Sequence, residues 1–200
     1  MTALSTATAG IWISHALEGT NMNDLSRDPI INIVHGQIRR GIRVTLENGC
    51  YASAIILIYS GIDTMAYLSM PPERQGVTRD DFERWADQYI RFPCEEQVRG
   101  LEFYAARCAM LHTHGIASRL SRQGRVRQIG YVDKSVPEVS YNPRVSENLV
   151  MVSVEALAEA FFAGSDRSLI DLFADERTAP VAEQRLRTLV HQLPFHNCEQ

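Results

Sequence analysis

Apolar side chains recur at helical spacing along the first part of the chain. Asp28 and Pro29 suit the cap and the first turn of a helix, and Asn48 and Gly49 suit its end. Between them, one face carries apolar residues at intervals of three and four: Ile31, Val34, Ile38 and Ile42. Intervals of this kind predict an α-helix over 29–48.

Three further helices are predicted after this one. Residues 50–69 are apolar on nearly all sides, which is typical of a helix in the middle of a bundle, and two prolines follow them. Thr78 opens a T-x-x-D capping sequence and therefore predicts a short amphipathic helix over 78–90. Apolar spacing then predicts a long helix over 95–114, which Gly115 closes.

The pattern changes to strand-like alternation in the second half of the chain. Polar and apolar residues alternate at 125–132, and residues 148–154 have a high β-propensity. These segments predict a two-stranded β-ribbon around a proline-containing loop at 137–143. Ser153 then suits the start of a new helix. Further helical turns are predicted for 166–175 and 179–192.

The predicted fold is mainly α, a helical bundle with a small two-stranded β-ribbon and a C-terminal helical annex. We expect residues 27–200 to form one domain, because 200 residues with 45% apolar content can bury a single sizeable core. Residues 1–26 are predicted to be a tail that is either partly disordered or packed through its few large apolar side chains. The core bundle, the β-ribbon and the C-terminal helices are expected at 28–116, 124–154 and 154–192.

Charge and cysteine content limit the classes of function. The net charge is −4, so any basic site must be local and not a property of the whole surface. The four cysteines form no C-x-x-C pair, so neither a zinc knuckle nor a disulfide framework is indicated. The N-terminal sequence lacks the features of a signal peptide, and no apolar run approaches the ~20 residues of a membrane span. We therefore expect a cytoplasmic protein with no membrane partner.

Residues 104–115, YAARCAMLHTHG, place two chemically active side chains in an apolar helix. Arg107 is a permanent cation, and the imidazole of His112 can accept and donate a proton. On a helix these two positions diverge by roughly 140°, because each residue turns the helix by about 100°. They can therefore share one site only if a second copy of the helix packs against the first, or if the long arginine reaches around.

The sequence RCAMLH resembles the R-x4-H motif of the HEPN superfamily. The neighbouring sequences GIDTMAYL and EFYAARCAMLHTHG are similar to a bacterial branch of that class, and the resemblance covers about residues 30–116. Members are helical bundles, and many are metal-independent ribonucleases of toxin–antitoxin and abortive-infection systems. They form dimers that bring two R-x4-H motifs together. The resemblance thus implies a homodimer, an RNA substrate and an antitoxin partner.

The same resemblance implies that Arg107 and His112 are the catalytic residues. Cleavage of RNA by its own 2′-hydroxyl needs a proton-transfer group near neutral pKa and a cation beside the phosphorus, and these side chains supply both without a metal. In some members a partner nucleotidyltransferase modifies a tyrosine two residues after the histidine, a position that His114 occupies here. Supporting residues are expected around the pair: Asp63, Tyr59, Tyr104 and His114.

A structural interpretation stays open beside the catalytic one. Asp63 is the one charged residue in the sequence YSGIDTMAY, where Tyr59 and Tyr67 share its helix face. Because buried charges are normally paired, Arg107 could serve only to pair with Asp63. The protein would then be a non-catalytic HEPN-like frame that binds a nucleotide or a protein partner, with His112 as an interface residue.

The densest basic stretch, SRLSRQGRVRQ, follows the R-x4-H sequence directly. It predicts either a phosphate-binding arm for RNA or a solvated ribbon edge whose charge prevents aggregation, and both interpretations stay open. Its cations are Arg119, Arg122, Arg125 and Arg127. His112 and His114 would diverge by about 200° on a helix, so they do not suggest a metal site. No motif suggests a cofactor.

Overall fold

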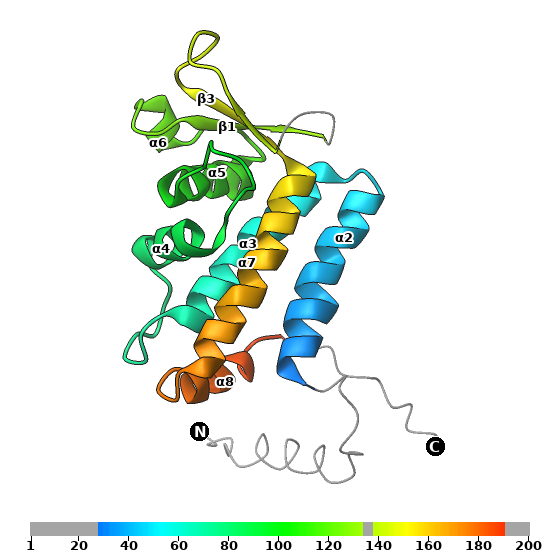
Figure 1. The fold of residues 1–200 in the computed structure, drawn as a ribbon, viewed down its shortest axis with the longest axis vertical. Coiled ribbons are helices and arrows are strands. Elements are labelled where there is room, and N and C mark those ends of the chain that lie inside the picture. Colours follow the sequence, from blue (N-terminus) through cyan, green and yellow to red (C-terminus); the bar gives the residue numbers. More distant parts are fainter. Residues whose placement is uncertain (1–27, 134–137, 191–200) are drawn as a thin grey trace, which may run out of the picture.

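In the computed structural model, residues 28–133 and 138–190 are described, and they form a mainly helical bundle with a small mixed sheet at one end (Figure 1). The helices are η2 (Ile30–Arg39), α2 (Arg40–Glu47), α3 (Tyr51–Ser69), α4 (Arg79–Tyr89), α5 (Gly100–Thr113), α6 (Arg119–Arg122), α7 (Val154–Ala174) and α8 (Ala179–Leu186). The strands are β1 (Gln128–Val132), β2 (Val139–Tyr141) and β3 (Leu149–Ser153). The tail predicted at 1–26 lies outside the described residues.

The first predicted helix forms over nearly its predicted length, but with two kinds of turn. Its first part, η2, is a π-helix, and α2 continues it as an α-helix up to Glu47, before Gly49 turns left-handed at φ 68°. A π-helix closes i→i+5 hydrogen bonds, so its turns are wider and its buried face shifts relative to an α-helix. Ile33 and Val34 are consequently buried, whereas Ile31, predicted to face the core, is 40% exposed.

Two long helices, α3 and α7, pack against each other at the centre of the bundle (Figure 1). From α7, Leu157 and Phe161 are fully buried, which makes this helix a core element and not the predicted annex. It is also one continuous helix, without the predicted break before 166–175. Gly164 does not end it, because Gly164 is a point of close approach to α4. A Cβ there would lie 2.5 Å from the carbonyl oxygen of Tyr89.

By length and composition alone, α3 could cross a membrane. A stretch of 18 residues within its 19 has a mean hydropathy of 1.3, and no other helix in the described ranges passes this test. The expectation that no apolar run approaches a membrane span is therefore wrong for α3. Half of this stretch is buried inside the bundle, so packing in the core accounts for the apolar character of α3.

The two helices that cover one side of α3 begin at specific caps. At the start of α4, Thr78 Oγ1 accepts a hydrogen bond from the N–H of Asp81, and the Asp81 carboxylate accepts from the N–H of Thr78, as the sequence predicted. Helix α5 begins at Gly100 and not at residue 95. The preceding segment is a loop in which the Gln97 side chain binds backbone carbonyl oxygens, and the buried Glu102 accepts the N–H at the helix start.

The predicted two-stranded ribbon is a three-stranded mixed sheet in the order β1-β3-β2. β1 pairs with β3 in parallel, with Ile129 opposite Val150, and β2 pairs with β3 antiparallel, with Val139 opposite Val152. Prediction missed β2 because it is only three residues long and lies in the segment assigned as loop. These four side chains are buried and join the core of the bundle.

A buried arginine from α8 closes the C-terminal end of α3. Arg185 is 7% exposed, and its guanidinium donates hydrogen bonds to the carbonyl oxygens of Leu68, Met70 and Pro71. The last carbonyl groups of a helix lack partners within the helix, and a cation is favoured beside them. α8 itself ends at Leu186, earlier than the predicted residue 192; residues 191–192 lie outside the described ranges.

Candidate functional site

An ion pair between Asp63 and Arg107 joins α3 to α5. Both Nε and Nη2 of Arg107 donate to Oδ2 of Asp63, at 3.0 and 2.9 Å. The two side chains are 29% and 26% exposed, so the pair is neither enclosed in the core nor fully solvated. The pairing that the structural interpretation expects is thus present. It also fixes the guanidinium at a position that solvent reaches.

Burial and pairing act in opposite directions on these two charges. Burial raises the pKa of the Asp63 carboxyl, and the hydrogen bonds from Arg107 oppose that rise. Burial lowers the pKa of the Arg107 guanidinium, but the hydrogen bonds to Asp63 outweigh this effect and leave the pKa raised. The arginine therefore stays a cation at any pH at which the protein would act.

The two histidines lie at the end of α5. His112 is exposed on the last turn, about 1.4 turns beyond Arg107 on an unbroken helix, which is roughly 7.5 Å along the axis and 140° around it. His114 follows the helix in the left-handed conformation at φ 50°, and its N–H donates to the carbonyl oxygen of Met110 at 3.0 Å. His114, and not the predicted Gly115, therefore closes the helix.

The two tyrosines proposed as supporting residues take part in packing. Tyr59 is fully buried, and its hydroxyl bonds with that of Tyr131 at 2.5 Å, which ties α3 to β1. Tyr104 packs edge-on against Phe82 of α4, and the guanidinium of Arg79 lies over its ring. Burial raises the pKa of both hydroxyls, so both stay protonated near neutral pH.

The basic stretch divides into three exposed arginines and one that is engaged. The exposed side chains lie on and just after α6, which follows α5 in the chain: Arg119, Arg122 and Arg125. Arg127 is different, because its Nε donates to Glu102 at 2.7 Å and its Nη1 to Glu96 at 2.6 Å. Its guanidinium also lies 4.6 Å from the centre of the Tyr141 ring. Arg127 is therefore not available to bind RNA phosphates, unlike the three exposed arginines.

This cluster around Glu102 was not found from the sequence. Burial alone would raise the pKa of Glu102, but hydrogen bonds from Arg127 and from the N–H of Arg99 outweigh it and hold the pKa below its usual range. The carboxylates lie 25 and 31 residues before Arg127, so no local pattern connects them. Only the packing of β1 beside the start of α5 brings them together.

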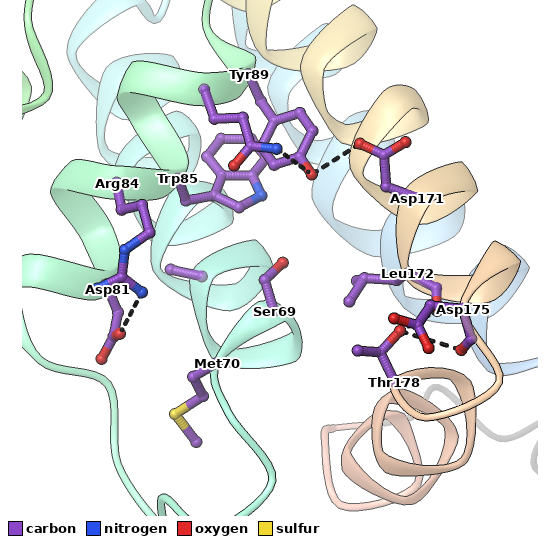
Figure 2. A pocket seen from close by; sticks show the side chains of 12 residues that line it. Ser69, Met70, Asp81, Arg84, Trp85, Tyr89, Asp171, Leu172, Asp175 and Thr178 are labelled. Atoms are coloured by element: carbon purple, nitrogen blue, oxygen red, sulfur yellow. Dashed lines mark hydrogen bonds and ion pairs between the residues drawn. The ribbon is translucent and has the colours of Figure 1, made fainter.

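A pocket of about 210 Å³ opens between the C-terminal end of α3, the helix α4 and the C-terminal part of α7 (Figure 2). In this view, Tyr89 reaches from α4 toward Asp171 on α7, and Ser69 projects from α3 below this pair. This pocket could not be predicted from the sequence, because its walls come from three separate parts of the chain. Its polar lining includes Ser69, Gln88, Tyr89, Asp171 and Thr178.

In the described ranges, no three His, Cys, Asp or Glu side chains gather where they could hold a metal ion. No protein-family model matches the sequence, and no curated protein or solved structure gives a match. The likeness to the HEPN superfamily therefore rests on the R-x4-H motif and the sequences around it.

Proposed function

We propose that the protein is a metal-independent endoribonuclease of HEPN type, in which Arg107 and His112 act on RNA at the seam of a two-fold homodimer. The accessibility of Arg107 carries this proposal. Its side chain is 26% exposed although Asp63 holds it, whereas the side chain of Arg39, an arginine engaged in the core, is 6% exposed. Arg107 is thus both positioned and open to a ligand.

The chemistry that these groups offer is transesterification. The 2′-oxygen bonds to phosphorus, the P–O5′ bond breaks, and the products are a 2′,3′-cyclic phosphate and a 5′-hydroxyl. His112 transfers the proton from the 2′-hydroxyl toward the leaving 5′-oxygen, since its imidazole is exposed and can both accept and donate a proton. Arg107 stabilises the negative charge that builds on the phosphoryl oxygens. Asp63 orients the guanidinium through its two hydrogen bonds.

The geometry of α5 supports a dimer. Arg107 and His112 diverge by roughly 140° and Asp63 holds the guanidinium, so a second copy of α5 that faces the first would bring both groups to one phosphate. Ile116, directly beyond α5, is 51% exposed and offers an apolar contact for such a seam. Arg119, Arg122 and Arg125 would follow the RNA backbone from there. An antitoxin or nucleotidyltransferase partner and a cytoplasmic location belong to the same proposal and rest on the resemblance.

The test is cleavage of single-stranded RNA by the purified protein in EDTA. We expect products with 2′,3′-cyclic phosphate ends, and a loss of rate of about 10²-fold or more in Arg107→Ala and in His112→Ala. Matched controls are Arg177→Ala, between α7 and α8, and His35→Ala, on η2, because both residues are exposed and lie on other elements. The controls should keep the wild-type rate, and all variants should keep the circular dichroism spectrum.

A second candidate is the non-catalytic helical frame, and the Asp63–Arg107 pair itself favours it, since joining α3 to α5 is a sufficient role for both residues. Two results together would select it. The wild type would cleave no RNA tested, and Arg107→Ala would unfold while His112→Ala kept its fold. A protein that stays monomeric at micromolar concentration in light scattering would also remove the composite site.

A further inference from the structure

The pocket between α3, α4 and α7 presents hydrogen-bond acceptors. Each of its three hydroxyl groups donates a hydrogen bond to another group of the protein. Ser69 Oγ donates to the carbonyl oxygen of Met65 at 2.8 Å, and Thr178 Oγ1 donates to that of Leu172 at 2.6 Å. The Tyr89 hydroxyl donates to Oδ2 of Asp171 at 2.9 Å. Ser69 Oγ also lies 3.4 Å from Ser168 Oγ, and the lone pairs that remain on Ser69 and Thr178 are what these hydroxyl groups offer a ligand.

Two side chains of the lining that carry N–H groups also donate to other groups of the protein. Trp85 Nε1 donates to Ser168 Oγ at 2.9 Å, and Gln88 Nε2 donates to the Tyr89 hydroxyl at 3.0 Å. The amide oxygen of Gln88 therefore adds another acceptor. At the edge of the pocket, Arg84 is 58% exposed and pairs with Asp81. The lining thus lacks a convergent set of donors for an anion or a carbonyl ligand.

The pocket also carries a carboxylate without an ion pair. Asp81 pairs with Arg74, and Asp175 pairs with Arg177. Within the described ranges no arginine or lysine pairs with Asp171, whose hydrogen bond comes from the neutral hydroxyl of Tyr89. Because Asp171 is exposed, its remaining lone pairs are open to a ligand. The volume of about 210 Å³ lies below the ~300–1,000 Å³ of drug-sized sites and suits a small metabolite.

We propose that this pocket binds a small organic cation with several N–H donors, of the alkylammonium or guanidinium class. The cationic head donates to Asp171, Ser69 and Gln88, and its alkyl part lies against Trp85 and Leu172. Such a cation is available either as a free amine or as the lysine or arginine side chain of a partner protein. The proposal shares no residue with the ribonuclease site and stands independently of it.

Isothermal titration calorimetry on the full chain tests both the charge and the donors. The probe is 1,4-diaminobutane, with 1,4-butanediol as its uncharged counterpart and tetramethylammonium as a cation without N–H groups. N-acetyl-lysine amide represents a lysine side chain. We expect saturable binding of 1,4-diaminobutane. Butanediol and tetramethylammonium should bind at least about 10-fold more weakly, since losing a hydrogen bond to a charged group reduces affinity by about that factor. Binding of only the lysine derivative would assign the cation to a partner protein.

Matched variants test the assignment to this pocket. Asp171→Asn should weaken diamine binding about 10- to 100-fold, because it removes the charge and keeps the shape. Glu176→Gln is the control, because it removes an equal charge from an exposed neighbour outside the lining, and it should leave binding unchanged. Gln88→Glu adds a carboxylate and should tighten binding. Equal binding of all three small probes, or unchanged binding by Asp171→Asn, would overturn the proposal.

Discussion

The free energy that couples Asp63 to Arg107 can be bounded from the structure. Fully exposed ion pairs contribute about 0.2–1 kcal/mol, and removing one partner of a buried pair costs about 3–5 kcal/mol. Exposed fractions of 29% and 26% place this pair between those limits. Two charge-assisted hydrogen bonds to one carboxylate oxygen strengthen it. We therefore expect a coupling energy of about 1–2 kcal/mol between the two side chains.

The assay is a double-mutant cycle on Asp63→Ala and Arg107→Met, measured by urea unfolding at neutral pH. The methionine keeps most of the aliphatic length of the arginine, so the cycle isolates the charge interaction as far as possible. The m-value should stay constant, because the surface exposed on unfolding hardly changes. Each kcal/mol should appear as a shift of about 2–4 °C in the melting temperature.

The ion pair of Arg177 and Asp175, whose side chains are 89% and 37% exposed, provides the internal control. A cycle on Asp175→Ala and Arg177→Met should give only the small coupling that is typical of exposed pairs, because water screens their charges. A coupling of Asp63 to Arg107 no larger than this control would refute the idea that Asp63 holds the guanidinium in place. A coupling above about 3 kcal/mol would instead mark a closed, purely structural pair.

Other regions of the fold give independent predictions. Arg185→Met should lower the free energy of unfolding by about 3–5 kcal/mol, since buried carbonyl oxygens lose their donors; a loss below 1 kcal/mol in urea unfolding would contradict the closing role. The lowered pKa of Glu102 means that its stabilisation is present above the unfolded pKa and lost as the pH falls through the lower folded value. Glu102→Gln should therefore be less stable than the wild type at pH 7, and its free energy of unfolding should depend less on pH below about pH 4.5. An unchanged dependence on pH in that range would contradict the role of the Glu102 carboxylate. Gly164→Ala should destabilise by at least about 1 kcal/mol, because its Cβ would meet the Tyr89 carbonyl and this outweighs the gain in helix propensity; a stabilised variant would show that the helices move apart freely. His114→Gly should raise the free energy of unfolding by about 0.5–1 kcal/mol, because glycine adopts the left-handed conformation without strain. A lower melting temperature in thermal unfolding would contradict this prediction.

Features with local causes could be predicted from the sequence. The capping box of Thr78 and Asp81 depends on residues three positions apart, and α3 is apolar along its whole length. The pairing of Asp63 with Arg107 was also within reach, because Asp63 is the only charged residue of α3, Arg107 lies in the apolar run from Tyr104 to Leu111, and each needs a partner. In these cases the sequence pattern and the packing impose the same solution.

Features with distant causes could not be predicted. Parallel pairing of β1 with β3 depends on how the connection crosses the sheet, and β-propensity carries no information on strand direction. The sequence pattern groups Arg127 with three other arginines of the basic stretch, because its carboxylate partners lie in another part of the chain. The cation pocket needs Ser69, Tyr89 and Asp171 to meet, and each of these residues alone is ordinary in a helix.

The closure of α3 by Arg185 has a consequence for the order in which the protein forms during synthesis. Leu68 and Arg185 are 117 residues apart. At about 5–20 residues per second, the ribosome needs roughly 6–23 s to make that stretch. During this time the nascent N-terminal half carries an unfinished helix end and an apolar face that α7 has not yet covered. The N-terminal helices therefore cannot complete their packing until the C-terminal helices have been made. The incomplete nascent chain is the form that chaperones would bind.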